Sequence, residues 1–194
     1  MRLLHLDPSG RLVLTDFPSQ SIPPYAILSH RWGDPDSEVL FGDIESNAYH
    51  KKDGYRKIEF CAKQAAQDQL QYFWIDTCCI DKWNLRELSS SINSMFFWYK
   101  NAARCYVFLS DVSVSSTHQQ SDWEASFQKS NWFHRGWTLQ ELIAPISVEI
   151  FSWEGQRIGD KTSFEQLVHD TIGIPLAVLR NCALDQFTVS GRLQ

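Results

Sequence analysis

Residues 25–33 read YAILSHRWG, a compact apolar run followed by a polar segment that ends in glycine. The run over residues 25–28 is typical of a buried strand, and residues 29–33 are typical of the loop that follows such a strand at its carboxyl end. Three later stretches have the same apolar, β-rich character: YFWIDTCCI (72–80), CYVFLSD (105–111) and VEIFSW (148–153). The sequence therefore predicts four buried strands.

Helical stretches separate these strands. Apolar residues recur with a helical period over residues 54–71, 88–99, 137–143 and 164–172. Strands that alternate with helices predict a doubly wound α/β fold, with a flavodoxin-like, mostly parallel sheet flanked by helices. Two minor strands are expected near residues 12–17 and 39–41, and the Ser- and Gln-rich residues 111–130 are expected to form a surface loop.

The composition limits the chain to a few classes of protein. Its 194 residues suffice for one domain, and a hydrophobic content of 43% supplies a core. Eighteen Lys and Arg against 23 Asp and Glu give a net charge of −5, which argues against a dedicated nucleic-acid-binding protein. No apolar run reaches the roughly 18 residues of a membrane span, and five cysteines, an odd number, favour reduced thiols. We therefore expect a cytoplasmic protein without a membrane span.

Polar residues gather where the predicted strands end. In doubly wound sheets, ligands bind outside the carboxyl ends of the strands, near the point where the strand order reverses. Asp76 and Asp81 bracket the end of the second strand, where a carboxylate either caps a helix or belongs to a site. The full set of these rim residues is Ser29, His30, Arg31, Trp32, Asp76, Asp81, Ser110 and Asp111. We expect them to face one rim of the sheet and to form the site.

Two further patterns have simpler explanations. Residues 155–162 read GQRIGDKT, which lacks the spacing of a phosphate-binding loop and is predicted to be a turn. Cys78 or Cys79 would need His30 or His134 as a base to act as a nucleophile, whereas cysteines on a buried strand are more commonly small core residues. The sequence has no CxxC pair, so we expect no metal site.

The segment WFHRGWTLQELIAP (132–145) carries the most informative carboxylate. If a helix begins near Arg135, Trp137 and Glu141 lie four residues apart on one face of it. Apolar residues follow Glu141, and a carboxylate on such a helix is costly unless it is paired or used. Two interpretations stay open. Glu141 serves a functional site, or it forms a salt bridge with Arg31, Arg104 or Arg135.

Several blocks, taken in order, resemble one known family. They are MRLLHLD, PPYAILSHRWGD, GYRKIEFCAKQAAQDQLQYFWIDTCCIDK, ELSSSINSMFFWYKNAARCYVFLSDV and WFHRGWTLQELIAP. Over residues 1–175 the chain resembles the heterokaryon incompatibility (HET) domain of filamentous fungi, with Arg31 where the family more often has threonine. The resemblance implies a domain that triggers cell death when genetically different fungal cells fuse, and an upstream sensor protein as a partner. Residues 176–194 are then a C-terminal tail or a truncated continuation.

The layout is also similar to that of TIR domains. Their plant-type members carry a comparable Trp-Cys-Leu-x-Glu-Leu block with the catalytic glutamate of NAD⁺ cleavage, and the matching position here is Glu141. The resemblance implies an NAD⁺ nucleosidase, with NAD⁺ as substrate and no further cofactor. Trp32 or Trp137 would then stack on a base, and Arg31 with Ser29 would hold the pyrophosphate. Because TIR-like domains commonly complete their site against a neighbour, the resemblance also implies a homo-oligomer.

A non-catalytic module is the alternative from another class. Such a module would trigger cell death by self-assembly or by recruiting partners, and Glu141 would be a structural residue paired with an arginine. A third hypothesis is a cysteine hydrolase that uses Cys78 or Cys79 as its nucleophile.

Overall fold

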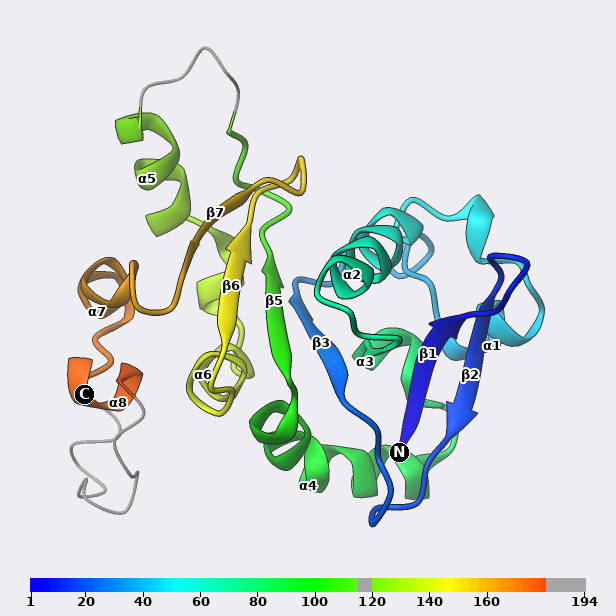
Figure 1. The fold of residues 1–194 in the computed structure, drawn as a ribbon. Coiled ribbons are helices and arrows are strands. Elements are labelled where there is room, and N and C mark those ends of the chain that lie inside the picture. The colour runs from blue at the N-terminus through cyan, green and yellow to red at the C-terminus, as the bar shows by residue number, and fades with distance from the viewer. Residues whose placement is uncertain (115–119, 181–194) are drawn as a thin grey trace.

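The computed structural model of the protein describes residues 1–114 and 120–180, which form one seven-stranded sheet covered by helices (Figure 1). The strands are β1 (Arg2–Leu6), β2 (Leu12–Asp16), β3 (Tyr25–His30), β4 (Tyr72–Trp74), β5 (Arg104–Phe108), β6 (Val148–Phe151) and β7 (Arg157–Asp160). The helices are α1 (Phe41–Glu45), α2 (Tyr55–Gln67), α3 (Asp76–Cys79), α4 (Leu85–Asn101), α5 (Gln120–Gln128), α6 (Thr138–Ile143), α7 (Glu165–Ile172) and α8 (Leu176–Leu179). Two short 3-10 helices are η1 (Tyr49–Lys51) and η2 (Asn131–His134).

Within the described residues, the central strands of the sheet run parallel to one another. The strand order is β2-β1-β4-β3-β5-β6-β7. β3 pairs in parallel with β4 and β5, and β5 pairs in parallel with β6, whereas β1, β2 and β7 join antiparallel at the edges. The predicted α/β class, with a sheet that is parallel at its centre and flanked by helices, is confirmed. The parallel strands follow the flavodoxin-like order, in which the winding reverses beside the first of them, β3.

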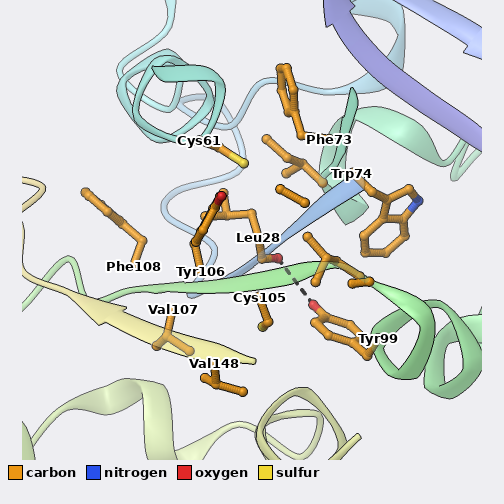
Figure 2. Packing of buried hydrophobic residues seen from close by; sticks show 14 of the residues in the cluster. Leu28, Cys61, Phe73, Trp74, Tyr99, Cys105, Tyr106, Val107, Phe108 and Val148 are labelled. Carbon is orange, nitrogen blue, oxygen red and sulfur yellow. Dashed lines mark hydrogen bonds between the residues drawn. The ribbon is translucent and has the colours of Figure 1, made fainter. Parts of the chain in front are cut away.

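Alternate residues of β5 face the two helical layers. Figure 2 shows Tyr106 and Phe108 on the side of β5 that faces Cys61 of α2, and Cys105 on the opposite side. The ring of Phe60 on α2 lies 6.4 and 5.0 Å from those of Tyr106 and Phe108, measured between centroids. Because both faces of the sheet are covered, its central strands are nearly continuous apolar runs. Any polar residue within them therefore needs its own explanation.

The second helical layer includes α4 and α6. Tyr99 of α4 donates a hydrogen bond from its hydroxyl to the carbonyl oxygen of Leu28 at 3.2 Å (Figure 2). Cys105 Sγ lies 3.7 Å from the carbonyl oxygen of Glu141 on α6. These contacts tie α4 to β3 and the short helix α6 to β5.

The strand predicted over residues 72–80 is shorter than expected. β4 ends at Trp74, and α3 begins at Asp76. The backbone amide of Cys79 donates to the carbonyl oxygen of Ile75 at 2.8 Å, which closes a helical turn. A short apolar run cannot be told from a buried helical turn by its periodicity, and residues 77–80 are apolar because they are buried.

The segment near residues 39–41 forms the start of a helix, and the prediction of a strand there is wrong. α1 begins at Phe41, and the side chain of Asp43 accepts a hydrogen bond from the amide of Leu40 at 2.8 Å. Contacts of this kind fix the first turn of a helix. Val39 is buried, which accounts for the apolar character of the segment.

Two segments contain more regular structure than the sequence predicts. α5 lies within the expected surface loop of residues 111–130, and β7 lies within the expected turn of residues 155–162. The β7 strand needs glycine at position 159, since a Cβ atom there would lie 2.3 Å from the ring of Phe164. β1 is a further strand that the patterns do not predict, and it pairs with β2 along its whole length.

The described chain ends with α8, which lies in the segment predicted to be a tail. Val178 and Leu179 of this helix are buried, and the rest of that segment, residues 181–194, lies outside the described residues. None of the described helices is both long and apolar enough to span a membrane.

Candidate functional site

Glu141 lies in a closed network of side chains between α6 and β3. The residue is only 3% exposed. Its Oε2 atom accepts hydrogen bonds from Ser29 Oγ at 2.6 Å and from Arg135 Nη1 at 2.8 Å, and its Oε1 atom accepts one from Arg135 Nη2 at 3.1 Å. The two contacts with Arg135 form a bidentate ion pair. Of the three arginines that the sequence left open as salt-bridge partners, Arg135 is therefore the one that Glu141 meets.

The charge of Glu141 is desolvated but balanced. Burial raises the pKa of its carboxyl group above the ordinary value, while Arg135 and the hydroxyl of Ser29 act in the opposite direction. Taking a carboxylate out of water is costly, and one guanidinium with two parallel hydrogen bonds offsets that cost. The geometry leaves a carboxylate that is fixed in place at the end of a central strand.

Ser29 links this carboxylate to the segment that precedes α6. Its hydroxyl donates to Glu141 and accepts a hydrogen bond from Trp132 Nε1 at 2.8 Å. Thr138 Oγ1 in turn donates to the carbonyl oxygen of Trp132 at 2.5 Å. A polar residue in the otherwise apolar strand β3 is thus explained by a chain of bonds that runs from η2 through the strand to α6.

Asp111, which follows β5, holds η2 in position. Its Oδ1 atom accepts from Ser130 Oγ at 2.7 Å, and its Oδ2 atom accepts from the backbone amide of Asn131 at 2.8 Å. Ser130 is the N-cap of η2 and accepts from the amide of Trp132. One carboxylate at the rim of the sheet therefore sets the position of the segment that carries Trp132 and Arg135.

His30 is the second polar residue at the end of β3, and its ring has no hydrogen-bond partner among the described residues. The residue is 2% exposed. Its Nε2 atom lies 3.8 Å from Oδ1 of Asp76, an atom that is likewise buried and unpartnered. Burial lowers the pKa of His30 well below its ordinary value, and the nearby cations Lys57, Arg135 and Lys82 act in the same direction. The imidazole is therefore neutral.

Asp76, the first residue of α3, connects His30 to Trp32 and Lys82. Trp32 Nε1 donates to Asp76 Oδ2 at 2.7 Å, and Lys82 Nζ lies 3.4 Å from the centroid of the Trp32 ring. Burial raises the pKa of Asp76 and lowers that of Lys82, whose Nζ atom has no hydrogen-bond partner in the described part of the chain. Unpartnered buried polar atoms are rare in native proteins, and several together indicate a place that a ligand or ordered water completes.

A pocket of about 350 Å³ opens beside this cluster, at the carboxyl ends of β3 and β5. Arg31, Trp32 and Ser110, which the sequence places at the rim, line it together. Glu38 and Lys57 also line the pocket and form a buried ion pair, in which Lys57 Nζ donates to Glu38 Oε1. The pocket lies where the strand order reverses, as the rule for doubly wound sheets requires.

Two predicted site residues lie apart from the cluster. Asp81 accepts a hydrogen bond from the amide of Trp83 at 3.0 Å, and it lines a different pocket together with Lys82 and Trp83. Trp137 is 45% exposed, although it is only four residues from the buried Glu141. α6 begins at Thr138, and Trp137 is its N-cap residue, whose carbonyl oxygen accepts from the amide of Glu141 at 3.2 Å. The two residues are one helical turn apart, but only the side chain of Glu141 is buried.

Cys78 and Cys79 are core residues. They are 0% and 3% exposed and form no disulfide. Burial raises the pKa of the Cys78 thiol to about 12 and that of Cys79 well above its ordinary value. Activated cysteines have lowered pKa values and some exposure, so neither thiol is placed as a nucleophile. In the described ranges, no group of three or more His, Cys, Asp or Glu side chains is arranged to hold a metal ion.

Three residues of the candidate site were not predicted from the sequence. Lys57 lies one helical turn before the buried Cys61, and that spacing places it on the buried face of α2. Lys82 directly follows Asp81, the second of the two carboxylates that bracket the predicted strand end, and Trp132 lies three residues before the arginine that binds Glu141. The position of each residue relative to a predicted site or core residue is visible in the sequence. Its contact partner, however, lies far away in the sequence and could not be predicted.

The comparisons with known proteins agree on one family. The sequence model described as "Heterokaryon incompatibility protein (HET)" matches residues 25–120. Over 100% of its length, the chain is 54% identical to the vegetative incompatibility protein HET-E-1 of Podospora anserina, and it spans 14% of the length of that relative. No solved structure matches the chain. With both the family model and this relative in agreement, the chain belongs to the heterokaryon incompatibility (HET) family.

Proposed function

We propose that this chain is the effector domain of a fungal incompatibility response, and that it triggers cell death by cleaving NAD⁺ at the bond between nicotinamide and ribose. The name of its relative, a vegetative incompatibility protein, supports the biological role. The observation that carries the chemistry is the fixed carboxylate of Glu141 at the switch point of the sheet, beside the unpartnered polar atoms of His30, Asp76 and Lys82. A site of this kind is built to receive a polar ligand.

The reaction needs few groups from the protein. The bond between ribose C1′ and the nicotinamide nitrogen breaks, and its electron pair neutralises the cationic ring, so no general acid is required. A water oxygen then bonds to C1′ and loses its proton to solvent, which yields ADP-ribose. Glu141 stabilises the oxocarbenium-like ribose in the transition state, as a carboxylate does in glycoside hydrolysis. No cofactor takes part, and NAD⁺ is the substrate.

Access to Glu141 requires Arg135 to move. The guanidinium covers both carboxylate oxygens, and its side chain is 17% exposed, so it can swing outward more readily than Glu141 itself. The positively charged end of the substrate then takes the place of the guanidinium. Ser29 keeps its hydrogen bond to Glu141 throughout, and Trp132 orients Ser29.

The Trp32 ring is the surface on which a base stacks in this proposal. Lys82 covers it in the unliganded protein by a cation–π contact. The ligand displaces Lys82 from the ring, while the bond from Trp32 Nε1 to Asp76 keeps the indole in place. Arg31, whose side chain forms no hydrogen bond or ion pair with the described residues, is free to bind phosphate.

Regulation by assembly belongs to the same proposal. The chain acts in the cytoplasm as a homo-oligomer, and a sensor elsewhere in the full-length protein or in a partner promotes the association. Packing against a neighbour supplies the free energy that displaces Arg135 and Lys82, so that the isolated domain is weakly active.

A non-catalytic, self-assembling module is the second candidate, and one observation favours it. The bidentate pair of Arg135 with Glu141 is the arrangement that a purely structural carboxylate would have. In that case the pair fixes α6 against β3, and cell death follows from recruitment of partners.

The experiment that separates the two candidates must account for the ion pair. Glu141→Gln alone leaves Arg135 partly buried without its counter-charge, which costs about 3 kcal/mol of stability. The informative comparison is therefore Arg135→Gln against the double variant Arg135→Gln/Glu141→Gln, because both lack the ion pair and only the first keeps the carboxylate. The assay is nicotinamide release from NAD⁺ at low and high protein concentration, with the melting temperature recorded for each variant.

The proposal predicts release by Arg135→Gln and none by the double variant. Arg135→Gln should have the lower melting temperature of the two, because it leaves the buried carboxylate of Glu141 without its counter-charge. Release by both variants would remove Glu141 from the chemistry. Absence of release from the wild-type chain at every concentration, together with cell death when it is expressed in a fungus, would favour the recruitment module.

A further inference from the structure

The pocket at the carboxyl ends of β3 and β5 combines three kinds of chemistry. Its volume of about 350 Å³ falls within the range of small-molecule sites. It is lined by two guanidinium groups, two exposed carboxylates and two partly exposed indole rings: Arg31, Arg56, Asp34, Asp53, Trp32 and Trp153. The site of NAD⁺ cleavage proposed above uses only Arg31 and Trp32 of this set.

The charged groups of the pocket are available to a ligand. Lys57 and Glu38 neutralise each other in a buried pair. The side chains of Arg31, Asp34 and Asp53 make no hydrogen bond or ion pair with any other described residue. One guanidinium and two carboxylates therefore face the same space without partners, and Arg56 lies beside them in contact with Trp153.

Trp153 and Arg56 form the far wall of the pocket. The guanidinium of Arg56 lies 4.0 Å from the centroid of the Trp153 ring, and its Nη2 atom donates to the carbonyl oxygen of Trp153 at 3.0 Å. Trp153 is 39% exposed and lies in the turn between β6 and β7, directly after the carboxyl end of β6. An indole held in this way offers a flat surface at the same rim as Trp32.

The loop that carries Arg31 is rigidly supported. Lys57 Nζ donates to the carbonyl oxygen of Arg31 at 3.1 Å, and Glu38 accepts from the amide of Gly33. Gly54 packs so tightly against this loop that a Cβ atom would lie 2.7 Å from the carbonyl oxygen of Ser37. The pocket is therefore formed before any ligand binds, which reduces the entropic cost of binding.

We propose that this pocket binds a nucleoside diphosphate, namely the adenosine diphosphate portion of NAD⁺. The guanidinium groups of Arg31 and Arg56 hold the diphosphate, Asp34 or Asp53 accepts hydrogen bonds from the ribose hydroxyls, and Trp153 stacks on the base. The choice of adenosine rests on the proposed function. Trp32 connects the pocket to the cluster around Asp76, so a dinucleotide can occupy both places at once.

Calorimetric titration with ADP tests the proposal directly. Arg31→Gln is the first variant, because its side chain has no contact in the fold to lose and its melting temperature should equal that of the wild type. We expect it to weaken ADP binding about tenfold, as the loss of a charge-assisted hydrogen bond does. Trp153→Leu should weaken binding by a similar factor through lost stacking.

Arg104→Gln is the matched control. Arg104 is the first residue of β5 and so lies at the opposite edge of the sheet from the pocket. Arg104→Gln removes the same charge from the protein and also loses ion pairs with Asp68 and Glu149. It should leave ADP binding unchanged, because these contacts lie away from the pocket. Equal weakening by Arg104→Gln would show a general effect of net charge and would overturn the assignment of the pocket. Undetectable binding of ADP to the wild-type chain at millimolar concentration would overturn it as well.

The two proposals fail in different ways. If ADP binds and Arg31→Gln abolishes binding while no nicotinamide is released, the pocket stands and NAD⁺ cleavage does not. If nicotinamide is released by the wild type while Arg31→Gln and Trp153→Leu leave the KM for NAD⁺ unchanged, NAD⁺ cleavage stands and the pocket does not.

Discussion

Among the individual residues, His30 is the least expected occupant of a central strand. Its neighbours in β3 are apolar or fully bonded, whereas both of its ring nitrogens lack partners. The neutral ring lies between the carboxylate of Asp76 and the cations Lys57, Arg135 and Lys82. Because protonation of such a buried histidine is unfavourable in the fold, the free energy of unfolding should depend on the pH.

The stability of the chain should therefore fall on mild acidification because of His30. Burial lowers the pKa of the ring in the folded chain, so below the ordinary value of 6.5 the unfolded chain binds a proton that the folded chain does not. The contribution of His30 is fully present well above pH 6.5 and is lost as the pH falls below that value, by at most about 1.4 kcal/mol per pH unit. Asp76 and Glu141, whose pKa values are raised, act in the opposite sense.

Because His30 and the two carboxylates affect the stability in opposite directions, the contribution of His30 is measured as the difference between the wild type and a variant that lacks the ring. Urea unfolding at a series of pH values should give a steeper acid loss for the wild type than for His30→Asn. His134→Asn is the control, since it removes an exposed ring, and it should follow the wild type. If His30→Asn and the wild type lose stability in parallel, the ring is already charged in the fold or has a partner there.

The candidate site shows which residues a sequence can place. Four of the predicted residues follow strand ends, and the parallel sheet brings these ends together, so their proximity was predictable: Arg31, Trp32, Asp76 and Ser110. Ser29, predicted to lie in the loop, is part of β3. The Arg135–Glu141 pair was predictable only as one of three options. The partners of Ser29 were not predictable, because Glu141 lies 112 positions and Trp132 103 positions away from it in the sequence.

On the scale of single elements, η2 is the one that positions Trp132 and Arg135, the partners of Ser29 and Glu141. It is only four residues long. Trp132 and Phe133 bury their rings, and the polar start of the element is held by Asp111 at the end of β5. Short 3-10 helices have little intrinsic stability. The link from Asp111 should therefore control the order of Trp132 and Arg135.

Asp111→Ala should loosen this element without unfolding the chain. It removes the acceptors for Ser130 and Asn131, so the amides of Asn131 and Trp132 should exchange with deuterium about tenfold faster, as expected for a local loss of roughly 1.4 kcal/mol. Ser110→Ala changes the neighbouring residue, whose side chain makes no described hydrogen bond, and should leave the exchange unaltered. Unchanged protection in Asp111→Ala would mean that the packing of Trp132 alone holds η2.

Two of the segments that the sequence misjudged share one cause. Residues 72–80 and 39–41 are apolar because they are buried, and burial by itself does not distinguish a strand from a helical turn. β7 was not predicted because Gly159 favours a turn when only the sequence is considered. In the structure this glycine is needed for the close contact with the ring of Phe164. The long periodic helices α2 and α4 were predictable, since their apolar stripes face the sheet over several turns.

At the scale of the whole molecule, the topology places the pocket and the buried polar cluster side by side at the carboxyl ends of the parallel strands. The pocket and the buried cluster share Trp32, and both lie where β3 separates the two halves of the parallel sheet. The unliganded protein covers each with its own cations, Lys82 on the Trp32 ring and Arg135 on Glu141. Under the proposed function, a covered site calls for a device that uncovers it, and self-association can provide one.

Self-association should therefore raise nicotinamide release per molecule as the protein concentration increases. Trp83 and Leu85 are 91% and 75% exposed and flank Asn84, the N-cap of α4. Apolar groups exposed to this extent commonly mark an interface, and Trp83 lies next to Lys82, one of the residues that must move. An interface formed at Trp83 and Leu85 could therefore move Lys82 away from the Trp32 ring.

Trp83→Ser/Leu85→Ser should then remain monomeric and lose the gain in specific activity with concentration, while Asn84 keeps the start of α4 intact. Ile146→Ser is the matched control, because Ile146 is 76% exposed but precedes β6 at the opposite edge of the sheet. Sedimentation velocity and nicotinamide release are measured on the same samples across a wide range of concentration. A constant specific activity in the wild type, or an equal loss in both variants, would show that uncovering the site does not depend on this surface, and the sensor would have to act on Lys82 and Arg135 by another contact.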